Sequence, residues 1–217
     1  MALITKSYFR GDINLPQTES IYQSVAVDNA IAFYEPEILQ KLLGYPLWKL
    51  LNAAYLDSIK SPDPVPLPAR FNTLINGEEF TFTYNGYSVT TKWNGLKNTE
   101  MISIISYYVY YNYRNITESK TTPTGEAKPK RENSNVYSSI PKLVYAWNRM
   151  IELYGQTPKP YELDYDSLKE IEDHFRDHTN YIHYNPEASA YNYLLANIAT
   201  YPEWIFTPLY KINSFLI

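Results

Sequence analysis

The sequence predicts a mainly α-helical protein, a helical bundle with an inserted β-hairpin and a C-terminal helical extension. Two observations lead to this fold class. Apolar residues recur every three or four positions in several stretches, as on the buried face of a helix. One short region instead alternates apolar and hydroxyl side chains on both sides of an Asn-Gly pair, which is typical of a hairpin. We expect residues 1–155 to form the core with the hairpin, and residues 156–217 to form the extension.

The first part of the chain carries the signals of three consecutive short helices. Ser20 can cap the first of them, and apolar residues at helical spacing follow as far as Phe33. Pro36 is placed to open the second helix and Gly44 to end it, because glycine readily adopts the left-handed conformation of a helix terminus. Pro46 then opens the third helix. We expect the three helices to pack as one hairpin-like unit.

The clearest local prediction is a β-hairpin over about residues 78–92. Asn85 and Gly86 suit a two-residue type I′ turn, because both central residues of that turn have positive φ. Such a turn decides which residues of the two strands lie opposite each other: Tyr84 and Tyr87, then Phe82 and Val89. One face of the hairpin is therefore apolar, and the other carries hydroxyl groups.

A tyrosine-rich helix is predicted next, from Asn94 or Gly95 to about Ile116. Between Met101 and Tyr113 nearly every residue is apolar or aromatic. A helix that is apolar all round is buried on several sides. We therefore expect either the central helix of the core or a helix shared between the core and a subunit interface.

The second half of the chain alternates a polar region with further helices. Residues 117–135 lack any apolar period and predict a long exposed loop with nearly balanced charge, so that a solvated loop is favoured over a nucleic-acid contact. A helix from about Val136 to Tyr154 ends at Gly155. Another helix follows after about residue 164, and a last one covers residues 188–201.

Composition and charge exclude several classes of site and partner. The chain has no cysteine, which excludes disulfides, thiolate metal sites and a cysteine nucleophile. Its net charge of −4 and isoelectric point near 5.4 argue against a general polyanion binder. The sequence has no signal-peptide pattern and no apolar stretch of roughly 18 residues, so we expect no membrane partner. The 23 tyrosines suit partly wet surfaces buried against partners, although a lineage that uses much tyrosine would show the same bias.

All three histidines, His174, His178 and His183, lie within ten residues, and two of them have metal-ligand spacing together with a glutamate. Glu170, His174 and His178 are four residues apart and would align along one face of a helix, where imidazole and carboxylate groups can hold zinc or another divalent ion. His178 also falls beside the apolar stripe of Phe175 and Ile182, so a half-buried core histidine is the competing interpretation. No glutamate lies between the histidines, as a metalloprotease helix would require. If the chain binds a metal, Glu170, His174 and His178 are the candidate ligands.

The sequence contains none of the common catalytic or phosphate-binding motifs. A Walker-type loop, a dinucleotide-binding glycine pattern and a nucleophile elbow are all missing, and only seven glycines are present. We therefore expect no catalytic residue, no cofactor and no enzymatic activity. The apolar end, Phe215-Leu216-Ile217, either folds back on the core or docks on a neighbouring protein.

Four degenerate motifs lie between Leu43 and Asn135, over less than half of the chain. They are Leu43-Gly44-Tyr45-Pro46-Leu47-Trp48; Arg70-Phe71 with Leu74-Ile75-Asn76-Gly77; Trp93-Asn94-Gly95-Leu96-Lys97; and Thr121-Thr122-Pro123-Thr124-Gly125-Glu126 with Glu132-Asn133-Ser134. Together they resemble the head-to-tail connector (portal adaptor) proteins of tailed bacteriophages, especially the crAss-like phages of Bacteroides. The region after Gly155 has no part in the resemblance.

The resemblance implies a structural virion protein of the phage neck, assembled in the cytoplasm of the bacterial host. Such connectors form a ring, usually of roughly twelve copies, between the portal protein and the next tail or neck ring, and DNA passes through the channel without sequence-specific binding. The implied interface residues come from the tyrosine-rich helix, the polar loop and the chain end: Tyr107, Tyr110, Tyr111, Thr122, Thr124, Lys128, Arg131, Phe215, Leu216 and Ile217.

Two alternatives belong to other functional classes. An aromatic-rich carbohydrate- or peptide-binding module would expose its tyrosines and tryptophans in a groove, whereas helical spacing predicts that Trp48 and Trp147 are buried. A metal-dependent enzyme would be built on Glu170, His174 and His178. The alternatives are separated by whether the aromatic rings are exposed and whether the histidines hold a metal.

Overall fold

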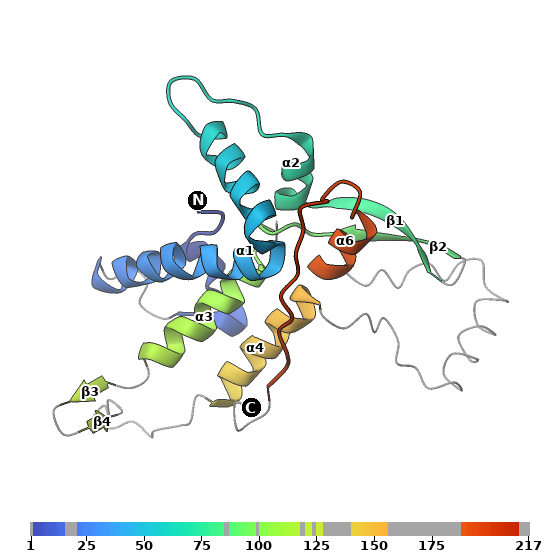
Figure 1. The fold of residues 1–217 in the computed structure, drawn as a ribbon. Coiled ribbons are helices and arrows are strands. Elements are labelled where there is room, and N and C mark those ends of the chain that lie inside the picture. The colour runs from blue at the N-terminus through green and yellow to red at the C-terminus, as the bar shows by residue number, and fades with distance from the viewer. Residues whose placement is uncertain are drawn as a thin grey trace, which may run out of the picture.

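The computed structural model describes residues 2–15, 21–84, 87–98, 100–117, 120–122, 125–127, 140–155 and 188–212. Its elements, in chain order, are the 3-10 turns η1 (Lys6–Tyr8) and η2 (Gly11–Ile13), α1 (Ile21–Ser58), α2 (Ala69–Asn76), β1 (Glu78–Tyr84), β2 (Tyr87–Trp93), α3 (Ile104–Thr117), β3 (Lys120–Thr122), β4 (Gly125–Ala127), α4 (Ile140–Tyr154) and α6 (Ala190–Ala196). The predicted fold class is confirmed: the protein is mainly helical, with a hairpin inserted between helices and a short C-terminal helix (Figure 1).

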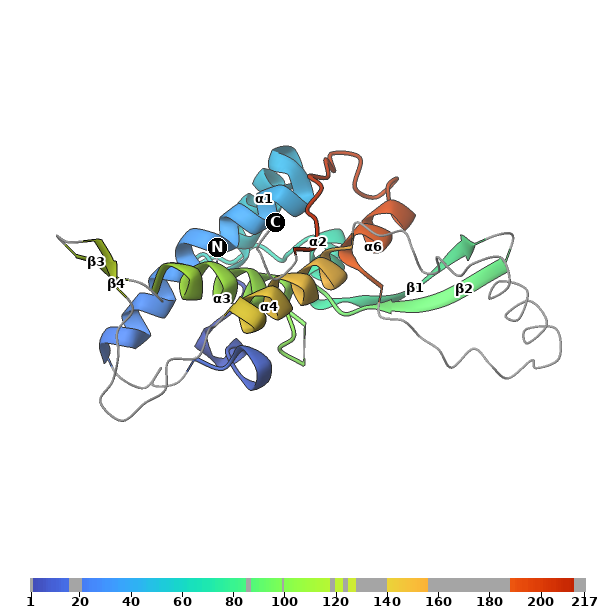
Figure 2. The same cartoon turned by 90° about the horizontal axis from the view of Figure 1, so that it is seen from below.

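Helix α3 is the central helix of the core, one of the two predicted alternatives. It packs against α1 on one side and α4 on the other (Figures 1 and 2). Every residue from Ile104 to Tyr110 is buried. Helices α1 and α4 of the same chain therefore bury opposite sides of α3. No described helix combines the length and apolar character that a membrane span requires.

Of the three short helices predicted at the start of the chain, the division at Gly44 is confirmed and the division at Pro36 is wrong, because α1 consists of two helical halves that meet at one break. The break is at Gly44, whose φ of 73° and ψ of 155° are not helical, and the two halves of α1 lie at an angle to each other (Figure 1). Pro36 lies inside the first half without ending it. The buried face continues across the proline through Ile31, Ile38 and Leu42, so core packing outweighs the hydrogen bond that proline cannot donate.

The first half of α1 ends against residues 201–212, which we call the C-terminal strap. The strap crosses α1 at its break and then runs along α4 (Figure 1). Three carbonyl groups that a helix end leaves unpaired accept hydrogen bonds from it: Leu43 from Ile205 N at 3.2 Å, Lys41 from Thr207 N at 3.0 Å, and Leu42 from Trp204 Nε1 at 2.8 Å. A Cβ atom on Gly44 would lie 2.7 Å from Ile205 Cβ. The strap therefore needs glycine at the break.

The described part of the predicted C-terminal extension belongs to the same core as the rest of the protein. The helix predicted over residues 188–201 is shorter, and Tyr193 in α6 and Tyr201 in the strap are fully buried in the common core. A Cβ atom on Gly155 would lie 2.1 Å from Ser189 Oγ, so residues 155 and 189 pack directly against each other. The helix predicted after residue 164 lies outside the described residues.

The hairpin is confirmed with its register. Strands β1 and β2 are antiparallel, and the structure pairs the predicted residues: Tyr84 with Tyr87 and Phe82 with Val89. On the hydroxyl face, Thr81 and Thr90 lie 3.0 Å apart through their Oγ1 atoms. The turn residues Asn85 and Gly86 are outside the described residues.

The tyrosine-rich helix begins about ten residues later than predicted, at Ile104 rather than Asn94 or Gly95. Asn98 (φ 47°) and Met101 (φ 61°) adopt left-handed conformations that a helix cannot contain. Ser103 Oγ then accepts a hydrogen bond from Ile105 N at 3.1 Å, as a helix cap does. The sequence pattern predicted the apolar character of this region, but it did not predict the left-handed conformations of Asn98 and Met101.

The polar region also differs from the prediction. The expected loop over residues 117–135 contains a second, short antiparallel hairpin, β3–β4, because strands of three residues are too short to show a period of two in the sequence. The first hairpin, β1–β2, and this second hairpin lie at opposite ends of the helical body (Figures 1 and 2). The helix predicted to end at Gly155 does so: α4 ends at Tyr154, and Gly155 has a φ of 74°.

Candidate functional site

The three tyrosines of α3 that were predicted to contact partners have different surroundings. Tyr107 and Tyr110 are only 6% and 2% exposed, so the chain's own core covers them and neither presents a surface to a partner. Their assignment to the interface is corrected for this reason. Tyr111 is half-buried, with its ring centroid 4.7 Å from that of Trp147 in α4. Of the three, Tyr111 alone remains an interface candidate.

Most other predicted site residues stay predictions. Thr122 lies in β3, where the backbone alone is described. The others lie outside the described residues: Thr124, Lys128, Arg131, Phe215, Leu216 and Ile217, together with the metal candidates Glu170, His174 and His178. Among the described residues, no three histidine, aspartate or glutamate side chains lie close enough together to hold a metal ion.

A connected row of aromatic rings crosses α1, α3 and α4, and we call it the aromatic surface; its middle ring, Tyr108, is only 3% exposed and belongs to the core. It begins at Phe33, which is 67% exposed, and continues through successive ring contacts: Phe33–Tyr34 (5.0 Å), Tyr34–Tyr108 (6.3 Å), Tyr108–Trp147 (6.1 Å) and Trp147–Tyr111 (4.7 Å). Trp147 Nε1 donates a hydrogen bond to the Tyr210 carbonyl of the strap at 2.7 Å. Large aromatic side chains with polar tips are the residues that dominate protein interfaces. The sequence predicted Tyr111 as an interface residue, but not the exposed Phe33 or the half-buried Tyr34.

One ion pair borders the aromatic surface. Lys41 donates hydrogen bonds to Glu37 and, at 2.8 Å, to the Tyr108 hydroxyl, which donates in turn to Glu37 at 2.8 Å. Burial favours the neutral forms, but the hydrogen bonds outweigh it, so the pKa of Glu37 is lowered and that of Lys41 is raised. Both groups therefore stay charged near neutral pH. A lysine with a raised pKa is a poor nucleophile, so this group joins α1 to α3 rather than forming a reactive centre.

The base of the first hairpin is fixed to the helical body by Tyr193 of α6. Its ring stacks on Trp93 with the centroids 5.3 Å apart, and contacts Phe80 edge-on at 5.2 Å. Its hydroxyl donates to Glu78 Oε1 at 2.6 Å, and burial raises the Tyr193 pKa. Tyr201 of the strap extends this network to α2 through the carbonyl of Arg70 at 2.7 Å. The hairpin therefore projects from a rigid base.

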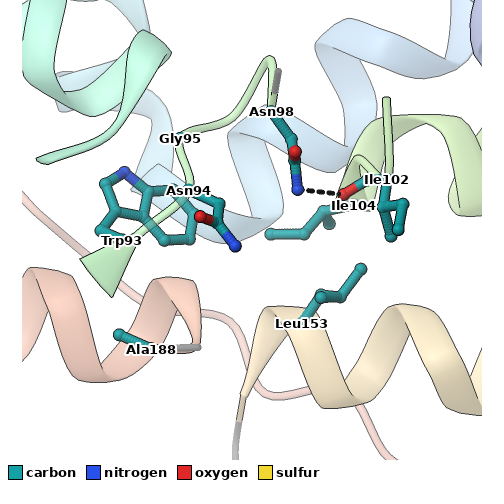
Figure 3. Close-up of a pocket in the computed structure, with 8 residues that line it drawn as sticks. All are labelled: Trp93, Asn94, Gly95, Asn98, Ile102, Ile104, Leu153 and Ala188. Atoms are coloured by element: carbon teal, nitrogen blue, oxygen red, sulfur yellow. Dashed lines mark hydrogen bonds between the residues drawn. The ribbon is translucent and has the colours of Figure 1, made fainter. Parts of the chain in front are cut away.

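A small pocket lies between the end of β2, the start of α3 and the end of α4 (Figure 3). It is lined by Trp93, Asn94, Gly95, Asn98, Ile102, Ile104, Leu153 and Ala188. Asn98 Nδ2 donates to the Ile102 carbonyl at 2.9 Å beside it. The pocket has room for about one water molecule. Small-molecule sites are far larger, so this pocket does not support one.

The second half of α1 and the loop after it carry exposed apolar side chains. Tyr45 is 59% exposed, Leu56 46%, Ile59 60% and Val65 57%. On the helix, Tyr45 and Leu56 lie on the side opposite the buried Leu47 and Leu51. Singly exposed apolar side chains are normal on a protein surface, so these four do not mark a contact site.

Comparison with known proteins returns no match: no protein-family model matches the chain, no curated protein is significantly similar in sequence, and no solved structure is significantly similar in fold. The likeness to phage connectors therefore rests on the sequence motifs alone.

Proposed function

We propose that the chain is a structural subunit of a head-to-tail connector ring in a tailed phage. The observation that supports this most is the position of the two hairpins at opposite ends of the helical body (Figures 1 and 2). In a ring, each copy contacts one neighbour with one surface and the other neighbour with a different surface. A chain that extends a hairpin at either end is suited to such head-to-tail contacts.

The anchoring of the first hairpin supports the same proposal. Strand edges pair readily with strands of another chain, and the affinity is higher when little conformational freedom is lost on binding. Tyr193 and Trp93 hold the base of the hairpin in place before any partner binds. The contact to a neighbour would therefore use a pre-organised surface.

The proposed ring places the chain in the virion neck, between the portal protein and the next tail or neck ring. Its net charge of −4 suits a channel wall along which DNA slides without sticking. In this proposal the partners are other copies of the chain, the two neighbouring ring proteins and the passing DNA. The chain has no catalytic role in it.

Cysteine cross-linking tests the head-to-tail contact, because the natural chain has no cysteine. Thr81→Cys places a thiol on the exposed face of β1, and Ile116→Cys places one at the end of α3 that leads to the second hairpin, where Ile116 is 64% exposed. When copies of the two variants are mixed and oxidised, we expect mixed disulfide-linked dimers. Tyr45→Cys, on α1, is the control. Linkage between Thr81→Cys and Ile116→Cys no greater than with the control would contradict the proposal.

The aromatic surface favours one second candidate, a carbohydrate- or peptide-binding module. Trp48 and Trp147, predicted to be buried, are both half-buried, and Trp147 lies within the row of rings. Bound sugar or peptide would stack on these rings and change tryptophan fluorescence. A saturable change with an oligosaccharide or peptide, lost in Trp147→Ala and kept in Trp48→Ala, would favour this candidate over the connector.

A further inference from the structure

The first hairpin has two outer edges, because its sheet contains only β1 and β2 among the described strands. In an antiparallel pair of strands, opposite residues alternately bond to each other and point their N–H and C=O groups outward. The carbonyl of Lys92 accepts a hydrogen bond from Ala188, outside the hairpin, so the pair Glu79–Lys92 points outward. With a period of two, the pair Thr81–Thr90 does so as well. Its Oγ1 atoms lie 3.0 Å apart, as expected where side chains of an outward pair approach closely.

The two edges differ at the base of the hairpin. On β2, the bond from Ala188 N to the Lys92 carbonyl, at 3.0 Å, means that the chain itself occupies the edge. On β1, no backbone hydrogen bond from another described element reaches Glu79 or Thr81. The edge of β1 is therefore the open one.

Strand β1 also lacks the features with which proteins block an exposed edge. Such features are lysine, proline and bulges, and β2 carries a lysine at its edge, Lys92. Strand β1 contains neither lysine nor proline, and its register with β2 runs from Glu78 to Tyr84 without a bulge. After the two glutamates at its start, it consists of aromatic and β-branched residues, which favour strands. An edge of this kind is a template for a strand of another chain.

We propose that the outer edge of β1 binds strand β3 (Lys120–Thr122) of the next copy of the chain. This inference rests on the connector proposal and names the strands that meet in its head-to-tail contact. Strands β3 and β4 are the only other strands in the described part of the chain, and they lie at the opposite end of the helical body (Figures 1 and 2). A contact between opposite ends of identical copies is head-to-tail and can close a ring.

Charge favours β3 over β4 as the added strand. The start of β1 is acidic, with Glu78 and Glu79. Strand β3 has Lys120 and no acidic residue, whereas β4 has Glu126. Opposite charges on neighbouring strands stabilise a sheet, and like charges destabilise it. Adding β3 therefore gives the acidic start of β1 a positive neighbour.

The short length of β3 makes ring closure important for this contact. A strand of three residues forms few backbone hydrogen bonds, so two isolated copies would bind each other weakly. In a closed ring the last contact forms within one assembly, at a high effective concentration. The contact should therefore be measured through the formation of the ring.

Proline substitution tests the edge in the full chain, because proline has no N–H group to donate. Thr81→Pro removes an outward donor of β1 and leaves the bonds between β1 and β2 in place. Thr90→Pro is the matched control, because it removes the outward donor directly opposite on β2, and both variants lose the contact between the two hydroxyl groups. In native mass spectrometry we expect ring-sized oligomers from the natural chain and from Thr90→Pro, and monomers from Thr81→Pro.

A ring-sized oligomer of Thr81→Pro would overturn the inference and leave the connector proposal standing. A natural chain that forms no ring would contradict both. Should neither proline variant form the ring, charge reversal decides: Lys120→Glu should abolish the ring, and adding Glu79→Lys to it should restore the ring. A ring from Lys120→Glu alone, or no ring from the double variant, would then overturn the inference.

Discussion

Gly44 shows how one residue joins two distant parts of the chain. Its conformation breaks α1, and its missing side chain leaves room for the strap residue Ile205, more than 150 positions away in sequence. Helix-ending glycines can be recognised from sequence because their role is local, and Gly44 was predicted as one. The contact with Ile205 could not be predicted, because nothing in the neighbouring residues records which distant segment crosses the break.

Substituting Gly44 tests this double role. Gly44→Ala places a Cβ atom 2.7 Å from Ile205 Cβ and forces alanine to a φ of 73°, so we expect a loss of about 2–5 kcal/mol in the free energy of unfolding in urea. Gly11→Ala is the control, because Gly11 has a φ of 60° but nothing lies within 4 Å of its added Cβ atom. It should lose only about 1–2 kcal/mol. Equal losses in the two variants would contradict the role of the strap contact.

Among the elements, those governed by short-range chemistry were predicted best. The first hairpin was predicted with its register, because strand alternation and the Asn-Gly turn are both local signals. The predicted start of α3 was wrong, because Asn98 and Met101 have left-handed conformations and the chain before Ile104 is therefore a loop. The prediction that a new helix begins at Pro36 was wrong for a related reason. Burial of the residues on both sides of the proline outweighed the preference of proline for a helix start.

The strap has no regular secondary structure, so side chains of α4 hold its backbone. Asn148 Oδ1 accepts from Ile212 N at 2.9 Å, and Asn148 Nδ2 donates to the Ile212 carbonyl at 2.9 Å. In Asn148→Ala both bonds are lost, and we expect the Ile212 amide to exchange with solvent at least about tenfold faster, a loss of about 1 kcal/mol or more. The amide of Ile205, bonded to Leu43, is the internal control and should keep its rate. An unchanged rate at Ile212 would show that Asn148 does not hold the strap.

For the whole molecule, the fold class was predicted, but the closure of the core by residues near the end of the chain was not. The sequence suggests a helical core followed by an extension, because the helical patterns come one after another along the chain. The structure instead returns residues 188–212 to the core, with Tyr193 and Tyr201 buried beside the hairpin and α2. Such closure depends on contacts between residues more than 100 positions apart, which periodicity cannot reveal. The aromatic surface was missed for the same reason, since it combines three helices.

Tyr193 and Tyr201 are fully buried in the common core, which predicts that the chain needs residues 188–212 to fold. Truncation after residue 187 removes α6 and the strap and should abolish cooperative unfolding in urea, because both tyrosines and the hydrogen bonds of the strap to α1 are lost. A truncated chain that still unfolds cooperatively, with the free energy of unfolding of the full chain, would contradict this description of the core.

The connector proposal is tested most directly by native mass spectrometry of the purified full chain, which reports copy number and bound metal together. We expect a closed oligomer of ring size, near the roughly twelve copies of the proteins that the motifs resemble, without bound metal. A chain that stays monomeric or dimeric at every concentration and retains one zinc ion per copy would contradict the proposal, and would direct attention to Glu170, His174 and His178.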